Sequence, residues 1–161
     1  QKIKEIEVEQ VVIDRVLPNA EFADSFWAPL KDNSMSLHDA ALKTLTTTPG
    51  WFDYLLRLRN LIVTPFGIKA EPDEKGRAKD AENFYGFFPL VSKNKGEIIL
   101  GFNDKHLDFR VLVYFQVEAG VKGVCLATIV KKHNLFGRIY LKTIMPFHKL
   151  IVPTMLKQLN K

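Results

Sequence analysis

The sequence predicts a single α+β domain in which an antiparallel sheet packs against a long C-terminal helix. Between residues 84 and 133 apolar residues recur with period two, in four segments joined by short turn-forming connections. Residues 36–65 and 137–161 instead repeat their apolar residues at helical spacing. A chain of 161 residues fits one domain, residues 1–161, and can bury roughly 68–70% of the surface that its unfolded form exposes.

Composition and charge argue against several classes of protein. No apolar run reaches the ~18 residues that a membrane-spanning helix needs, and the charged start Gln1–Gln10 is not the pattern of a signal peptide. The one cysteine, Cys125, cannot form an intrachain disulfide, which favours a cytoplasmic protein. The net charge of +5 comes from scattered basic residues without a nucleic-acid-binding motif, so we expect no nucleic-acid partner.

The N-terminal part is expected to form one strand and a connector. Residues 3–17 begin with alternating apolar residues and predict a first strand that ends at Pro18. Residues 19–30 are rich in aromatic side chains and are interpreted as the connection from this strand to the helices.

Two helices are expected next. Ser36 is suited to cap the first one, Asp39 complements the positive end of its dipole, and the helix is expected to end near Leu45. Thr48–Pro65 predicts a second helix, whose apolar face comprises Trp51, Leu55, Leu58 and Ile62. Residues 66–83 are charged and interrupted by glycine and proline, which predicts a loop.

A meander of four strands should follow, which makes five strands in all. The predicted segments are 84–92, 96–103, 107–118 and 121–133, and their short connections indicate antiparallel neighbours. The third segment alternates most clearly, so its two faces can be separated. One face carries Phe109, Val111, Val113, Phe115 and Val117, and the other carries Asp108, Arg110, Leu112, Tyr114 and Gln116.

The last segment predicts a long helix over residues 137–161. At 1.5 Å per residue it would span roughly 35 Å, enough to cross the sheet. Pro146 and Pro153 predict a kink, or a late helix start near Pro146. One stripe of this helix comprises Leu141, Ile144, His148, Ile151, Met155 and Leu159.

Several short motifs resemble a known family, in addition to Trp51–Pro65 in the second helix. They are Ala23-Asp24-Ser25-Phe26, Leu100-Gly101-Phe102, His106-Leu107-Asp108-Phe109-Arg110, His133-Asn134, Gly137-Arg138-Ile139-Tyr140 and Pro146-Phe147-His148-Lys149. With this order of elements, the chain resembles the helix-grip superfamily (SRPBCC), which includes START lipid-transfer domains and birch-pollen-allergen-like proteins. Within it, the chain resembles DUF2867, an uncharacterised bacterial family. The resemblance implies a hydrophobic pocket between the sheet and the C-terminal helix.

His148 is the first candidate site residue. It lies on the apolar stripe of the last helix, and a histidine there can hydrogen-bond a ligand or act as a general base near neutral pH. The competing interpretation is a core histidine bonded to a backbone carbonyl or a carboxylate.

Asp108 and Arg110 are two residues apart on one strand and therefore point the same way. They are candidates for a charge pair at a pocket mouth, with His106 on the same side. Tyr114 shares this face and is a further candidate contact. The alternative is an ordinary surface pair on a solvated face, which contributes little to stability.

Other residues carry weaker signals. Arg138 near the helix start is suited to attract an anion, although Gly137–Tyr140 also fits a structural glycine turn. Tyr140 and Trp51 are candidate ligand contacts, although aromatic residues more often simply fill a core. The small residues Gly123, Cys125 and Ala127 would leave room for a ligand or for close approach of the helix.

The leading hypothesis is a binding module for a small hydrophobic or amphipathic ligand. His148, Tyr114 and Arg110 would supply its main polar contacts. One alternative is a cyclase or isomerase with His148 as base and Arg110 stabilising negative charge. Another is a protein-interaction or homodimerisation domain. We expect no cofactor, no metal site and no recognisable nucleophile motif.

Overall fold

The computed structural model describes residues 3–46, 84–85, 88–103 and 107–160. Seven strands form one antiparallel sheet in the spatial order β1-β2-β7-β6-β5-β4-β3. The strands are β1 (Lys4–Ile6), β2 (Phe22–Pro29), β3 (Phe84–Tyr85), β4 (Phe88–Lys93), β5 (Ile98–Asn103), β6 (Leu107–Glu118) and β7 (Val121–Lys132). Within the described residues, the helical elements are α1 (Gln10–Val16), α2 (Leu37–Thr46), α5 (Leu135–Leu156) and the 3-10 helix η3 (Lys157–Asn160).

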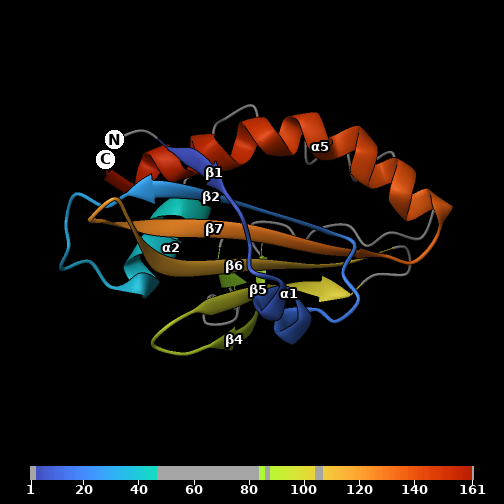
Figure 1. Ribbon diagram of the computed structural model, residues 1–161, viewed down its shortest axis with the longest axis horizontal. Coiled ribbons are helices and arrows are strands. Elements are labelled where there is room, and N and C mark those ends of the chain that lie inside the picture. Colours follow the sequence, from blue (N-terminus) through green and yellow to red (C-terminus); the bar gives the residue numbers. More distant parts are fainter. Residues whose placement is uncertain (1–2, 47–83, 86–87, 104–106, 161) are drawn as a thin grey trace.

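Helices cover both sides of the sheet, α5 on one side and α1 on the other (Figure 1), and apolar side chains fill both interfaces. The helix face packs against α2 and α5, and its central side chains include Val111, Val113 and Leu126. The outer face packs against α1, and Leu112 and Ala127 lie on it. Directly paired residues of antiparallel strands point to the same face, so the register assigns every described strand residue to one side.

The predicted strand over residues 3–17 is wrong beyond its first residues. Only Lys4–Ile6 pair as a strand, and the chain then forms α1. Ile13 and Leu17, four residues apart, are buried against Ile129 on the outer face. The β-branched composition of this segment favours a strand, but burial of one helical stripe against the sheet overrides that local preference.

The predicted connector over residues 19–30 is also wrong, because most of it forms β2. This strand lies between β1 and β7 and pairs with β7 along its whole length. Its aromatic residues point to both faces, so the polar–apolar alternation that identifies a half-buried strand is missing.

Trp27 on the outer face explains the small residue Gly123. The indole N–H of Trp27 donates a hydrogen bond of 2.9 Å to the backbone oxygen of Gln116 on β6, so the ring must cross β7. A Cβ atom at Gly123 would lie 2.3 Å from the indole nitrogen. The glycine therefore makes room for a tryptophan and not for the C-terminal helix.

The start of α2 is confirmed. The hydroxyl of Ser36 accepts a hydrogen bond of 3.1 Å from the backbone N–H of Asp39, which is the predicted N-cap. The helix ends at Thr46, one residue after the predicted Leu45. The predicted second helix, Thr48–Pro65, and the predicted loop 66–83 lie outside the described residues.

The predicted antiparallel meander is confirmed, but its first predicted strand is divided into two. Segment 84–92 forms two paired strands, β3 and β4, and the other three segments match β5, β6 and β7 to within two residues. With β2 added, the sheet has seven strands where five were expected. The predicted faces of β6 are correct, since Phe109, Val111, Val113 and Phe115 all belong to the core on the helix face.

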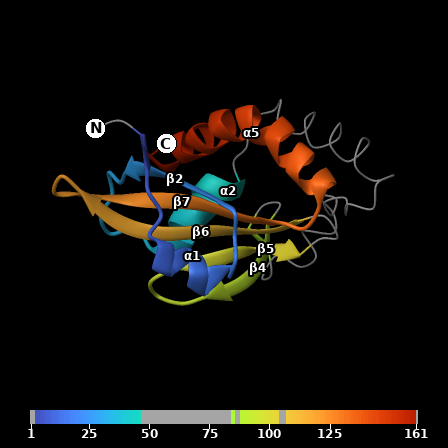
Figure 2. The ribbon, with the colours of Figure 1, turned by 45° about the vertical axis from the view of Figure 1, so that its right-hand side comes forward.

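The long C-terminal helix is confirmed, but it starts earlier than predicted. Asn134 caps α5 by accepting a hydrogen bond of 2.9 Å from the backbone N–H of Gly137. The helix continues through Pro146 and Pro153, so the late start near Pro146 is wrong. Figure 2 shows α5 as a curved helix above the sheet. Among the described helices, none is long and apolar enough to cross a membrane.

Candidate functional site

A buried carboxylate meets α5 on the helix face of the sheet. Asp24 of β2 is only 6% exposed, and both of its carboxylate oxygens lie 3.1 Å from Nε2 of His148. The ammonium group of Lys149 lies 3.4 Å from the same carboxylate. His148 therefore bonds to a carboxylate inside the protein, as the competing interpretation of this residue proposed.

Lys149 extends these contacts to the edge strand. Its ammonium group donates a hydrogen bond of 2.9 Å to Glu5 of β1. This hydrogen bond, together with the charge of Asp24, raises the pKa of Lys149 despite some loss of solvation. The lysine therefore stays positively charged and joins α5 to two neighbouring strands.

Thr128 adds a third polar side chain beside this pair. It is the direct partner of Asp24 on β7 and of Val111 on β6, so it points to the helix face. It belongs to the middle of the sheet, yet it remains partly accessible while Val111 beside it is buried. We call Asp24, Thr128 and His148 the helix-face polar cluster.

Apolar side chains surround one end of this cluster. Val130 and Leu141 are buried there with Leu107, and Phe22, Phe109 and Met145 pack against them while staying partly accessible. Three polar side chains thus lie beside an apolar surface built by the sheet and the N-terminal half of α5. Such a surface with a few polar groups is the usual chemistry of a site for a small amphipathic molecule.

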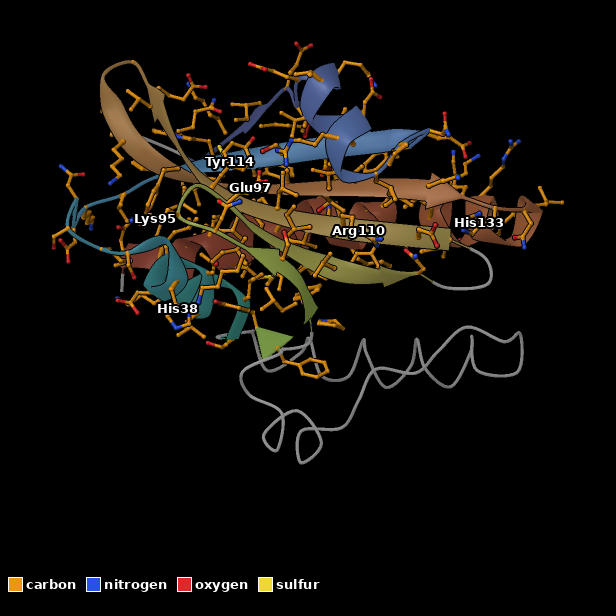
Figure 3. The ribbon with its side chains drawn as sticks, turned by 90° about the horizontal axis from the view of Figure 1, so that it is seen from below. His38, Lys95, Glu97, Arg110, Tyr114 and His133 are labelled. Atoms are coloured by element: carbon orange, nitrogen blue, oxygen red, sulfur yellow. The ribbon has the colours of Figure 1, made fainter. Side chains whose placement is uncertain are left out.

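The sheet separates three of the other predicted site residues from His148. Asp108, Arg110 and Tyr114 alternate with the helix-face residues of β6, so they lie on the outer face. Figure 3, which views the sheet from the side away from α5, shows Arg110 and Tyr114 along β6 with the long helix behind it. Arg110 and Tyr114 therefore do not converge with His148 on one space.

The predicted charge pair between Asp108 and Arg110 is not formed. Asp108 instead pairs with His133, at 2.9 Å between Oδ1 and Nε2. Arg110 donates hydrogen bonds of 2.8 Å to the side chain of Asn103 and of 2.7 Å to the backbone oxygen of Phe109. The two residues are on one face, as predicted, but each bonds to a different neighbour.

Three further candidates cannot be placed. Trp51 and His106 lie outside the described residues. Tyr140 belongs to α5, but its side chain is outside what the structure describes. Arg138 is exposed in the first turns of α5, and Gly137 is buried there and bonds to the capping Asn134.

Tyr114, which is partly buried, and Cys125, which is buried, form a polar group on the outer face. They are direct partners on β6 and β7, and Ser25 lies beside them on β2. Burial raises the pKa of the Cys125 thiol to about 12 and that of the Tyr114 hydroxyl to about 12. A thiol that keeps its proton is a poor nucleophile, so Cys125 is not suited to catalysis.

These two groups predict a loss of stability in alkaline solution. The unfolded chain releases a thiol proton near pH ~8.5 and a tyrosine proton near ~10, whereas the folded chain holds both to about pH 12. The free energy of unfolding should therefore fall as the pH rises through this window. Urea denaturation at several alkaline pH values measures the slope. Cys125→Ala should reduce this slope. An unchanged slope in that variant would show that ionisation of the thiol does not cause the loss of stability.

A second polar cluster was missed by the sequence analysis. Nδ1 of His38, at the start of α2, lies 2.6 Å from the hydroxyl of Tyr85 and 3.0 Å from the ammonium group of Lys93. Tyr85 is buried and Lys93 is exposed. These residues come from α2, β3 and β4, and no short-range spacing in the sequence indicates that they meet.

Metal ligands are not gathered in the described part of the chain, where no group of three or more histidine, cysteine, aspartate or glutamate side chains could hold an ion. The helix-face polar cluster and the cluster of His38, Tyr85 and Lys93 each contain one histidine.

Comparison with known proteins places the chain in a family without assigning an activity. No curated protein and no solved structure matches it. A family model described as "Protein of unknown function (DUF2867)" matches residues 16–155, which leaves β1 and nearly all of α1 before the matched part. The matched part contains both Asp24 and His148. Because the match covers most of the chain, this protein belongs to the DUF2867 family.

Proposed function

We propose that this domain is a helix-grip-like module of the SRPBCC type that binds a small hydrophobic or amphipathic molecule between the sheet and α5. The order of elements supports the proposal. A strand, β2, precedes the first helix of the helix face, the meander β3–β7 follows, and α5 returns over the sheet. β2 pairs with the last strand, β7, so α5 lies over strands from both ends of the domain.

The observation that carries the proposal is the helix-face polar cluster. Asp24 and His148 are polar groups placed inside an apolar interface, and Thr128 stays accessible in the middle of the sheet. Thr128 makes no hydrogen bond through its hydroxyl within the described residues. An open polar position beside Phe22, Phe109 and Met145 suits the polar end of a ligand whose apolar part covers these side chains.

The same geometry supports a ligand whose polar end donates a hydrogen bond. Nε2 of His148 faces the Asp24 carboxylate and therefore carries a proton. In a neutral imidazole, Nδ1 is then an acceptor. A hydroxyl or amide group of the ligand would donate to Nδ1 and exchange a hydrogen bond with Thr128.

The enzyme alternative loses its proposed partner for His148. Arg110 is on the outer face and is bonded to Asn103, so it cannot stabilise charge on a substrate beside α5. The site therefore supports binding better than a cyclase or isomerase reaction.

Binding is tested by native mass spectrometry of the purified protein, followed by titration with the fluorescent amphipathic probe anilinonaphthalene sulfonate. We expect one bound molecule per chain and a saturable fluorescence increase. Thr128→Phe should weaken probe binding at least about tenfold, because the larger side chain would fill the accessible space at the cluster.

The control is His133→Ala, which removes a histidine of similar carboxylate geometry on the other side of the sheet. It should leave probe binding unchanged. An empty protein that binds the probe weakly, or equally well in Thr128→Phe, would contradict a ligand site on the helix face.

A further inference from the structure

The outward side of α5 carries an unusual set of exposed apolar residues. Seven large hydrophobic side chains are exposed among the described residues, and four of them belong to this helix. They are Leu135 (70% exposed), Ile139 (56%), Phe147 (47%) and Leu150 (58%). The other three are single valines on α1, β4 and β6, so the leucine, isoleucine and phenylalanine side chains gather on α5 alone.

The spacing of these residues makes them one surface. Leu135, Ile139 and Leu150 follow at i, i+4 and i+15, with the exposed Pro146 between the last two. Leu141, Val152 and Met155 lie on the opposite side of the helix and are buried against the sheet. We call Leu135, Ile139, Pro146, Phe147 and Leu150 the outer stripe of α5. The helix itself lies on the side of the sheet opposite to α1 (Figure 1).

Basic residues run beside the outer stripe. Arg138, Lys142 and Lys149 are all exposed and follow at i, i+4 and i+11. Arg138 and Lys149 each precede a residue of the outer stripe by one position, a rotation of about 100° around the helix, and Lys142 precedes the exposed Thr143. Arg138 and Lys142 form no ion pair within the described part of the chain, whereas Lys149 pairs with Glu5 and Asp24.

The charge of the C-terminal segment has one sign only. Residues 119–161 contain eight of the 23 basic residues and none of the 18 acidic ones. This segment therefore carries +8, while the preceding 118 residues carry −3. A partner of α5 would meet a surface that is apolar and cationic, with no acidic side chain from the helix itself.

We propose that α5 docks, through its outer stripe, onto an anionic membrane surface. A helix with large apolar side chains beside lysine and arginine is suited to lie in the lipid interface, where the apolar groups enter the acyl boundary and the cations reach the headgroups. A second copy of the chain is disfavoured as the occupant, because two such helices would bring like charges together. Nucleic acid would use the cations but leave three aliphatic side chains without an apolar partner.

Vesicle flotation tests the proposal with the full chain. The protein should float with vesicles of mixed phosphatidylcholine and phosphatidylglycerol and remain largely unbound to phosphatidylcholine alone. The paired substitution Arg138→Gln/Lys142→Gln should lower the apparent partition coefficient by roughly thirtyfold. Ile139→Gln/Leu150→Gln should lower it by at least about tenfold. Both pairs are on the exposed side of the helix, so thermal melting should show that the fold is retained.

The matched control is Lys31→Gln/Lys95→Gln, which removes the same two charges at exposed positions away from the outer stripe. It should float nearly as well as the parent protein. Equal flotation with both vesicle types, or full flotation of both α5 variants, would overturn the proposal. Self-association in sedimentation velocity that Leu150→Gln abolishes would also overturn it, since a second copy would then occupy the stripe. Ligand binding beneath α5 is a separate measurement, so the two proposals can fail independently.

Discussion

Gly101→Ala is expected to destabilise the domain by about 3 kcal/mol or more, which is among the largest effects of a single substitution. Gly101 lies in β5 opposite Arg110 and has a φ of 142°, a conformation that side chains disfavour. A Cβ atom there would lie 2.1 Å from the backbone oxygen of Phe109 and 3.0 Å from the Cα atom of Arg110. Both are main-chain atoms of a central strand, so no rotamer change relieves the contact, and strand β5 must move away from β6.

The matched control is Gly120→Ala. Gly120 also has a positive φ, of 78°, but no heavy atom beyond its two chain neighbours lies within 4 Å of its added Cβ. Its cost should be that of the backbone conformation alone, about 1–2 kcal/mol. Urea denaturation of the two variants measures the difference in the free energy of unfolding. Equal costs in both variants would contradict a steric clash at Gly101.

The part of the fold that the sequence predicts well depends on local patterns. Ser36 can be recognised as a cap because its partner, Asp39, is three residues away. The alternation over Phe109–Val117 is visible because one side of β6 is consistently apolar. In both cases the physical cause and its sequence signal lie within one short segment, so tertiary structure is not needed to interpret them.

The two wrong predictions in the N-terminal part, at α1 and β2, have the opposite cause, because the residues that determine these elements are distant in the sequence. β2 is covered on both faces, with Phe26 on the helix face and Trp27 on the outer face, so its sequence does not alternate. α1 is a helix in spite of its valines because Ile13 and Leu17 are buried on the sheet. Both outcomes depend on partners far away in the sequence, such as Ile129 for Ile13 and Leu126 for Phe26, which local patterns do not contain.

The candidate site shows the same limit. His148 could be selected from the apolar stripe of α5, but its partner Asp24 is 124 residues away and is identified only by the fold. The sequence correctly predicts that Arg110 and Tyr114 share one face of their strand. It does not show that this face lies on the side of the sheet away from His148. Both faces of β6 carry apolar side chains, and the sequence does not say which one meets α5.

His148→Ala is expected to lower the free energy of unfolding by about 3 kcal/mol. The substitution leaves the Asp24 carboxylate, whose side chain is 5% exposed, without its closest donor, and only Lys149 at 3.4 Å remains. His133→Ala is the matched control, because the His133–Asp108 pair has a similar distance but side chains that are 32% and 14% exposed. That variant should lose no more than about 1 kcal/mol. Urea denaturation of both variants measures the two losses in the free energy of unfolding. Equal small losses would show that leaving the buried Asp24 carboxylate without His148 carries no extra cost.

The double variant Asp24→Val/His148→Leu separates stability from binding. Replacing both members of a buried pair with apolar side chains removes the unpaired charge, so the double variant should regain most of the stability that His148→Ala loses. If it does, the pair is not needed to hold α5 on the sheet. Loss of probe binding in this stable variant would then show that Asp24 and His148 contribute to ligand binding. Retained probe binding would leave Asp24 and His148 as a structural contact and move the polar end of the site to Thr128.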